Sequence, residues 1–442
     1  MKPNKEIFRI ALPAIVSNIT VPLLGLCDTT IAGHLGSERF LAAIAVGTMM
    51  INSALWCLGF LRSGTTGMTA QALGAKDTDK IHELFSKSLS IGLLMGLVLV
   101  LLQWPLAWLL LTLIEPEPAV RDLAGLYFQI CIWGAPAILG TMSVSGWFLG
   151  MQTSFYPMLI AVITNIVNII MSLLSVFALD MGFAGIAAGT CFANWFGLLL
   201  ALWLARRFNQ GKLPFIGWRK ALRLKGSGQF FKVNVYIFLR SFFLMAVTLG
   251  MTAFGARIGS LTLAANAVMM QFFLFFSYFM DGFAFAAEAL VGRGVGSKDC
   301  RLLSRTGHSL LVWGIGMTAV FTAIYAFGWR PIASLITDER AVVDTIGEFS
   351  LCLGLLPLIS VASFIYDGVY IGMTQTRMMM VSTVAGAVMF YGVECLLPAS
   401  ADPLKANALL WVAFLAYLLA RGGWLALMCP RALRNSLAGR VN

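Results

Sequence analysis

Apolar residues run through this chain in twelve long stretches, separated by short segments that hold most of the charged positions. A helix needs about 20 mostly apolar residues to cross the hydrocarbon core of a bilayer. The stretches therefore predict twelve transmembrane helices and an all-α polytopic membrane protein. The predicted spans are 7–32, 40–73, 89–114, 121–149, 156–179, 183–205, 231–256, 262–291, 306–329, 344–373, 377–397 and 406–428.

The composition agrees with this class and excludes others. Of the 442 residues, 59% are hydrophobic and 12% are charged, whereas about 25% of the residues in a soluble globular protein are charged. A soluble enzyme, a disordered chain and a secreted disulfide-rich protein are therefore excluded. The eight cysteines lie far apart in the sequence, so we expect neither a metal site nor a disulfide framework.

The chain lacks the short motifs of several common enzyme classes. It has no Gly-x4-Gly-Lys-[Ser/Thr] phosphate-binding loop, no His-Glu-x-x-His zinc motif and no Gly-x-Ser-x-Gly nucleophile motif. We therefore expect no enzymatic activity and no cofactor. Any active transport by this chain would be driven by an ion gradient.

Lys and Arg are distributed unequally between the two sides of the predicted protein. With the N-terminus in the cytoplasm, 22 of them lie in cytoplasmic segments and six on the opposite side. Cytoplasmic loops of membrane proteins carry an excess of these residues, so both termini are predicted to be cytoplasmic. The same rule accounts for the formal net charge of +11 without a nucleic-acid partner.

The sequence is duplicated at an offset of 222 positions. Gly74-Ala75-Lys76-Asp77 reappears as Gly296-Ser297-Lys298-Asp299, and the run from Gly146 to Met151 reappears from Gly368 to Met373. Each half then holds six spans, so the halves are expected to be parallel repeats about an axis along the membrane normal. The predicted parts are a six-helix lobe at 1–205, a basic cytoplasmic linker at 206–232 and a second six-helix lobe at 233–442.

Few charged residues fall inside the predicted spans, where a charge is costly and commonly marks a transport pathway. Asp28 is notable because the apolar part of its span holds no other acid or base. Arg421 and Glu394 lie near span ends, and we expect both side chains to extend toward the membrane surface. The remaining charges within spans are Arg62, Arg240, Asp281, Glu288 and Asp367.

Helical spacing places some of these residues on common faces. Asp281 and Glu288 are seven positions apart, and Arg62, Thr66 and Thr69 also share a face. Arg62 and Asp281 occupy nearly corresponding places in the two halves, at an offset of 219. One interpretation is a pair of oppositely charged stripes that line a cleft between the lobes. The alternative is a set of ion pairs that fix helix packing.

Several runs resemble a known transporter family. The run from Val21 to Thr29, Val-Pro-Leu-Leu-Gly-Leu-Cys-Asp-Thr, is similar to the first span of the multidrug and toxic compound extrusion (MATE) family. The runs from Phe60 to Gly67 and from Asp281 to Ala289 resemble the DinF branch of that family. The resemblance covers essentially the whole chain. It implies twelve helices in two lobes, and export of amphipathic or cationic compounds across a bacterial inner membrane in exchange for protons or sodium.

The resemblance also implies roles for residues of the first half. Asp28 matches the family's span-1 acid, the proposed proton-binding group, and Asn168 and Thr190 match polar residues that bond to it. Related sequences often carry an Asp four residues after that Asn, whereas this chain has Ser172. The resemblance therefore leaves Asp28 as the acid of the first lobe.

In the second half, Asp367 matches a span-10 acid that contributes to cation binding in the sodium-coupled branch. Span 7 lacks the acid that accompanies it there and offers Tyr236 and Arg240 instead. This difference favours protons over sodium as the coupling ion.

Two functions of different classes fit these observations. The first is a secondary antiporter for amphipathic or cationic small molecules, acting as a monomer within membrane lipid. The second is a flippase for lipid-linked oligosaccharides, which would need a cationic cleft. The spans hold more acids than bases at depth, which favours the antiporter. The candidate cleft residues are Arg62, Thr66, Thr69, Tyr236, Arg240, Asp281 and Glu288.

Overall fold

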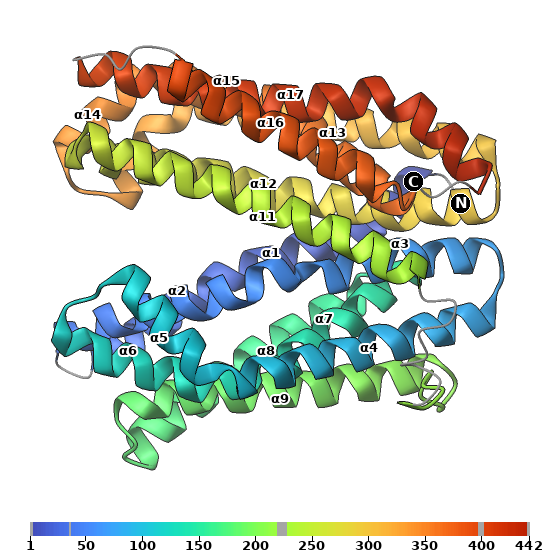
Figure 1. The fold of residues 1–442 in the computed structure, drawn as a ribbon, viewed down its shortest axis with the longest axis horizontal. Helices are drawn as coiled ribbons and strands as arrows, with labels where there is room; N and C mark the ends of the chain where they lie inside the picture. Colours follow the sequence, from blue (N-terminus) through green and yellow to red (C-terminus); the bar gives the residue numbers. More distant parts are fainter. Residues whose placement is uncertain (1–2, 35–36, 219–227, 397–401, 440–442) are drawn as a thin grey trace. The chain divides into compact units, whose positions relative to one another are not determined.

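The computed structural model describes residues 3–34, 37–218, 228–396 and 402–439. Every regular element in these ranges is a helix, and twelve helical segments are long and apolar enough to cross a membrane (Figure 1). This confirms the predicted all-α membrane architecture. Residues 219–227 of the predicted linker lie outside the described residues.

The helices follow one another with short connections. Two 3-10 turns, η1 (Cys57–Gly59) and η2 (Ile132–Gly134), join helices of one span, and a π-helical turn, η3 (Leu174–Ala178), extends α8. The helices of the first half are α1 (Pro3–Gly33), α2 (Glu38–Trp56), α3 (Phe60–Gly74), α4 (Thr78–Leu101), α5 (Gln103–Ile114), α6 (Pro118–Cys131), α7 (Ala135–Gly150), α8 (Phe155–Leu173) and α9 (Phe183–Phe208). Those of the second half are α11 (Gly228–Ile258), α12 (Ser260–Gly296), α13 (Cys300–Ile336), α14 (Arg340–Glu348), α15 (Ser350–Gly372), α16 (Thr376–Leu396) and α17 (Pro403–Leu437).

The third span differs from its prediction. The sequence predicted one helix over 89–114, whereas α4 ends at Leu101 and α5 begins at Gln103. Pro105 explains this break, because a proline ring lacks the N–H group and clashes with the carbonyl four residues earlier. That carbonyl belongs to Leu101, the last residue of α4.

Contacts divide the chain into two compact units. One is Leu12–Phe230, here called the N-terminal unit, and the other is Met1–Ala11 together with Phe231–Asn442, here called the C-terminal unit. The lobe boundaries given above stay a sequence-based prediction. The sequence did not indicate that the first eleven residues group with the second half.

The start of α1 makes specific contacts within the C-terminal unit. Arg293 of α12 donates to the carboxylate of Glu6 at 2.5 Å. The ring of Phe8 lies edge-on to Trp313 with centroids 4.6 Å apart, and edge-on to Phe283 at 6.2 Å. Such aromatic pairs add about 0.5–1.5 kcal/mol to the burial of their surface. An ion pair and two ring contacts therefore hold this segment.

The duplication is visible in the backbone of two helix connections. Lys76 and Lys298 both adopt positive φ, at 58° and 54°. The next residue in each case caps the following helix, since Asp77 accepts from the amide of Lys80 at 2.9 Å and Asp299 accepts from the amide of Leu302 at 2.9 Å. The repeated Gly-x-Lys-Asp motif is thus a turn followed by a helix N-cap.

Repeated glycines also allow close helix contacts at equivalent places. A Cβ on Gly146 would lie 2.4 Å from the carbonyl oxygen of Arg62, and a Cβ on Gly368 would lie 2.3 Å from that of Ala284. Both pairs obey the offset of 222, so Ala284 is the counterpart of Arg62. Asp281 precedes that counterpart by three residues, so Arg62 and Asp281 correspond to within one helical turn.

We predict that Gly368→Ala destabilises the C-terminal unit by about 1–3 kcal/mol, the usual effect of overpacking. The obstacle is the backbone of α12, which can give way only if the two helices separate. Thermal unfolding in detergent measures the effect. Gly316→Ala is the matched control, because nothing lies within 4 Å of a Cβ there. An unfolding temperature equal to that of wild type for Gly368→Ala would contradict the packing account.

Candidate coupling and binding sites

Asp28 lies on α1 within the N-terminal unit and is only 7% exposed. Its Oδ1 atom is buried and has no hydrogen-bond partner. An apolar cluster begins one turn later on α1 and continues on α2, α6, η3 and α9. Its members are Ile31, Ala32, Ala43, Ile44, Val120, Tyr127, Cys131, Val176, Phe183, Ile186 and Ala187. A carboxylate in such surroundings receives little of the solvation that stabilises its charge.

A polar network connects α8 and α9 in the same unit. The amide of Asn168 donates to the hydroxyl of Thr190 at 3.2 Å, and the hydroxyl of Ser172 donates to Asn168 Oδ1 at 3.3 Å. Thr190 donates in turn to the carbonyl of Ile186 at 3.0 Å. The structure thus brings Asn168 and Thr190 into contact with each other. The bonds from both residues to Asp28 that the resemblance implied stay a prediction. Oδ1 of Asp28 accepts no hydrogen bond from them in this conformation.

Helix packing makes this network compact. A Cβ on Gly189 of α9 would lie 2.5 Å from the amide nitrogen of Ser172, so only glycine permits this approach. The π-helical turn η3 begins at Leu174, two residues after Ser172. Single π-helical turns are rare and occur frequently at functional sites. The polar groups therefore lie beside an irregular segment of the helix.

Tyr127 and Cys131 of α6 also belong to this site, although sequence reasoning missed them. Both side chains belong to the cluster that begins one turn after Asp28, and the Cys131 thiol lies 3.8 Å from the carbonyl oxygen of Ala187. Tyr127 is 4% exposed and Cys131 is 3% exposed. The only available signal was their spacing of four residues, which places both on one face of α6.

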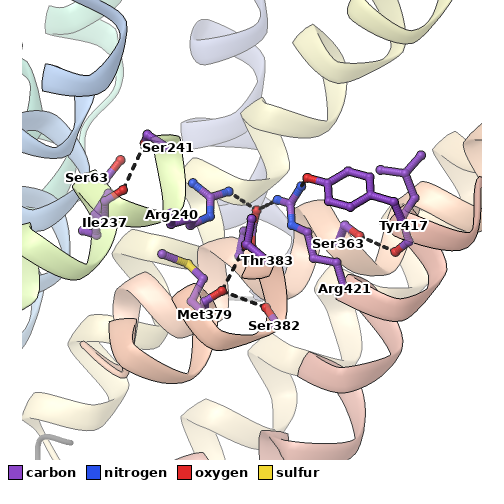
Figure 2. Close-up of polar contacts among 12 residues, drawn as sticks. Ser63, Ile237, Arg240, Ser241, Ser363, Met379, Ser382, Thr383, Tyr417 and Arg421 are labelled. Carbon is purple, nitrogen blue, oxygen red and sulfur yellow. Dashed lines mark hydrogen bonds and ion pairs between the residues drawn. The ribbon is translucent and has the colours of Figure 1, made fainter. Parts of the chain in front are cut away.

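The C-terminal unit contains a triad of charges, in which Asp367 and Arg421 are buried and Arg240 is half-buried. Arg240 of α11 and Arg421 of α17 both donate from Nη2 to the same oxygen, Oδ2 of Asp367 on α15. Figure 2 shows the two guanidinium groups directed toward one another. Asp367 and Arg421 are each 6% exposed. The expectation that Arg421 extends to the membrane surface is therefore wrong, because ion pairing with Asp367 holds it inside the unit.

The triad leaves several polar atoms unused. Asp367 Oδ1, Arg240 Nε and Arg421 Nε are buried and have no hydrogen-bond partner. Arg421 also donates from Nη1 to the hydroxyl of Tyr417 at 3.3 Å. Tyr236 is half-buried one turn before Arg240 on α11.

The other candidate cleft residues lie on α3 and α12. Thr66 and Thr69 are fully buried, and both contact Gly150 of α7. Glu288 is 2% exposed. A Cβ on Gly372 of α15 would lie 2.8 Å from the backbone carbonyl oxygen of Glu288. Arg62 and Asp281 are half-buried. The described residues contain no group of three or more His, Cys, Asp or Glu that could hold a metal ion.

The two halves differ at equivalent positions. Asp28 corresponds at the offset of 222 to Gly250, and Asn168 corresponds to Phe390. In the second half these residues are in contact, since a Cβ on Gly250 would lie 2.8 Å from the Phe390 ring. Asp367 corresponds to Ser145. The duplicated scaffold thus carries different buried acids in its two units. Asp28 has an unbonded oxygen, whereas Asp367 is paired with two arginines.

Comparison with known proteins assigns the family. The MatE family model matches residues 13–174 and 237–393. The chain is 33% identical over 444 residues to "DNA damage-inducible protein F" of Escherichia coli, covering 98% of this chain and 93% of that protein. The chain therefore belongs to the MATE family of membrane transporters, which confirms the resemblance stated above.

Further relatives and solved structures agree with this assignment. "Probable multidrug resistance protein NorM" of Acinetobacter baylyi is 26% identical over 357 residues, covering 77% of this chain and 76% of that protein. The Vibrio cholerae MATE transporter VcmN in the bent form matches with a TM-score of 0.86 and 18% identity, covering 100% of this chain and 99% of that one. A MATE structure in the bent conformation matches with a TM-score of 0.88 and 16% identity, covering 99% and 98%. These two structures share the fold.

We predict that Asp367→Asn destabilises the C-terminal unit more than Arg240→Gln does. The first change leaves two guanidinium groups without a counter-charge, and such a loss costs about 3–5 kcal/mol for a buried pair. The second change leaves Arg421 paired with Asp367, so the loss is smaller. Thermal unfolding in detergent gives the order. The double variant Asp367→Asn/Arg240→Gln should unfold at a higher temperature than Asp367→Asn alone. If the two single changes in unfolding free energy simply added in the double variant, the coupling would be contradicted.

Proposed function

We propose that this protein is a secondary active efflux transporter that exports amphipathic or cationic compounds in exchange for protons. The observation that carries the proposal is Asp28, a buried carboxyl with an unbonded oxygen and the only charged residue between Arg9 and the end of α1. A buried ionisable group of this kind within a membrane span is a candidate for ion coupling. The relatives named for multidrug resistance support the substrate class.

Protonation of Asp28 changes two properties of the site. It removes a negative charge from an apolar environment, and it gives the carboxyl an O–H donor that the carboxylate lacks. Asn168 Oδ1, which now accepts from Ser172, then becomes a possible acceptor for Asp28. A proton can drive a conformational change only by binding the two states with different affinity. A hydrogen bond available only to the protonated acid supplies such a difference.

The coupling ion is proposed to be the proton rather than sodium. Oδ2 of Asp367, the residue that matches the family's cation-binding acid, is bonded to Arg240 and Arg421. The two guanidinium groups compensate its charge, which leaves little attraction for sodium. Hard cations also prefer several oxygen ligands, and the part of the chain that the structure describes gathers no such acidic group.

The orientation of the protein in the membrane is inferred from the charge distribution. With 22 Lys and Arg on the side of the termini and six on the other, both termini are proposed to be cytoplasmic. The protein would then act in the bacterial inner membrane, take substrate from the cytoplasm and admit protons from outside. A single chain holds both units, so the transporter is proposed to work as a monomer.

We predict that Asp28→Asn abolishes proton-driven transport, because the amide keeps the shape of the acid and cannot titrate. Proteoliposomes with an imposed pH gradient and a cationic phenanthridinium dye measure the effect. An imposed sodium gradient should give no accumulation with wild-type protein.

The matched control is Asp122→Asn, which neutralises an exposed acid on α6 of the same unit and should leave transport intact. If Asp28→Asn vesicles accumulated the dye at the wild-type rate, Asp28 would not carry the coupling proton. Detergent-solubilised variants should elute as folded monomers, which separates a coupling defect from misfolding.

A further inference from the structure

The charges of the triad Arg240, Asp367 and Arg421 do not balance. Two guanidinium groups face one carboxylate, so the triad carries one excess positive charge. Arginine does not lose its proton in proteins, so the excess cannot be removed by titration. The Arg421 side chain is 7% exposed and that of Arg240 is 14% exposed. An excess charge at this depth is costly unless another group compensates it.

The geometry of the ion pairs is unusual for a purely structural bridge. An arginine and a carboxylate commonly form two parallel hydrogen bonds, which use both carboxylate oxygens. Here both arginines donate through Nη2 to Oδ2 of Asp367. The Nε atoms of both arginines therefore remain as buried donors without a partner. Two unused charged donors from different helices are what a second oxyanion requires.

The helices that pack around the triad also carry hydroxyl groups. Thr383 lies on α16, which packs on α17, and it is fully buried. Its hydroxyl donates to the carbonyl of Met379 at 3.1 Å, so its oxygen can still accept. Tyr417 receives a hydrogen bond from Arg421 at 3.3 Å. Arg240 is the most exposed member of the triad and therefore the one that a ligand can reach.

We propose that this triad is a binding site for a carboxylate-sized anionic group of the transported compound, held by Arg240 together with Arg421. The proposal rests on the proposed export function and adds a preference, among its amphipathic substrates, for molecules that also carry an acidic group. Binding an anion would neutralise the excess charge. Hydrogen bonds to charged groups contribute about 1.5–3 kcal/mol, which corresponds to an affinity gain of about tenfold or more.

A pair of dyes that differ only in this group tests the proposal. One is a rhodamine with a free carboxylate, and the other is its ethyl ester. Fluorescence anisotropy with purified protein in nanodiscs measures both affinities. Wild-type protein should bind the free acid about tenfold more tightly than the ester. Equal affinities for acid and ester, or a preference for the ester, would overturn the proposal even without any variant.

The variant Arg240→Gln should remove the preference. It leaves Asp367 paired with Arg421, so the unit keeps a balanced ion pair. Binding of the acid should weaken about tenfold, while binding of the ester should not change. Arg240→Lys keeps the charge and should keep part of the preference. The control Arg330→Gln alters an exposed pair with Asp344 and should leave both affinities unchanged.

The outcomes separate this site from the transport mechanism. Equal weakening of acid and ester in Arg240→Gln would show that the triad is structural only and would overturn the anion site. Proton-driven transport of the ester tests the proposed export function by itself, because the ester has no acidic group. A failure of that transport with an intact preference for the acid in binding would count against the export function alone.

Discussion

An ionised side chain inside a membrane protein has no bulk water to stabilise it, so its charge must be compensated, removed or exposed. This constraint explains most of what distinguishes the two units of the chain. In the C-terminal unit, Asp367 is compensated by Arg240 and Arg421 from two other helices. In the N-terminal unit, Asp28 lies beside an apolar cluster and has an unbonded oxygen. Only the second arrangement leaves protonation as the means of removing the charge.

The duplicated scaffold makes this difference informative. Equivalent glycine contacts recur at an offset of 222. Gly146 and Gly368 each let their helix pack directly against the backbone of a neighbouring helix. On that common frame Asp28 and Asn168 are replaced by Gly250 and Phe390. The packing therefore does not require an acid at this place, which supports a functional interpretation of Asp28.

Much of the fold could be predicted from the sequence because the length and hydropathy of an apolar stretch identify a membrane helix. The number of spans, the duplication and the family were all correct. The break between α4 and α5 was missed because hydropathy does not respond to a single proline, Pro105. The position of the first eleven residues was missed because the partners of Glu6 and Phe8, which are Arg293 and Trp313, lie about 300 positions away along the chain.

The candidate sites were predicted less completely than the fold. Asp28, Asn168 and Thr190 could be placed by resemblance, and the structure brings the last two into contact. Arg421 was misjudged because its position near a span end resembles that of a surface residue, whereas its role depends on an acid on another helix. Tyr127 was missed for the same reason, because its place in the site depends on residues of other helices. Pairings between distant helices are set by packing, and no local pattern in one helix reveals them.

The central claim is that the protein's transported proton resides on Asp28 and not on Asp367. Difference infrared spectroscopy of the protein in lipid, across a pH titration, detects the C=O stretch of a protonated carboxyl directly. The account predicts a pH-dependent carboxyl band in wild-type protein that disappears in Asp28→Asn and persists in Asp367→Asn. A band that persists in Asp28→Asn and disappears in Asp367→Asn would contradict it.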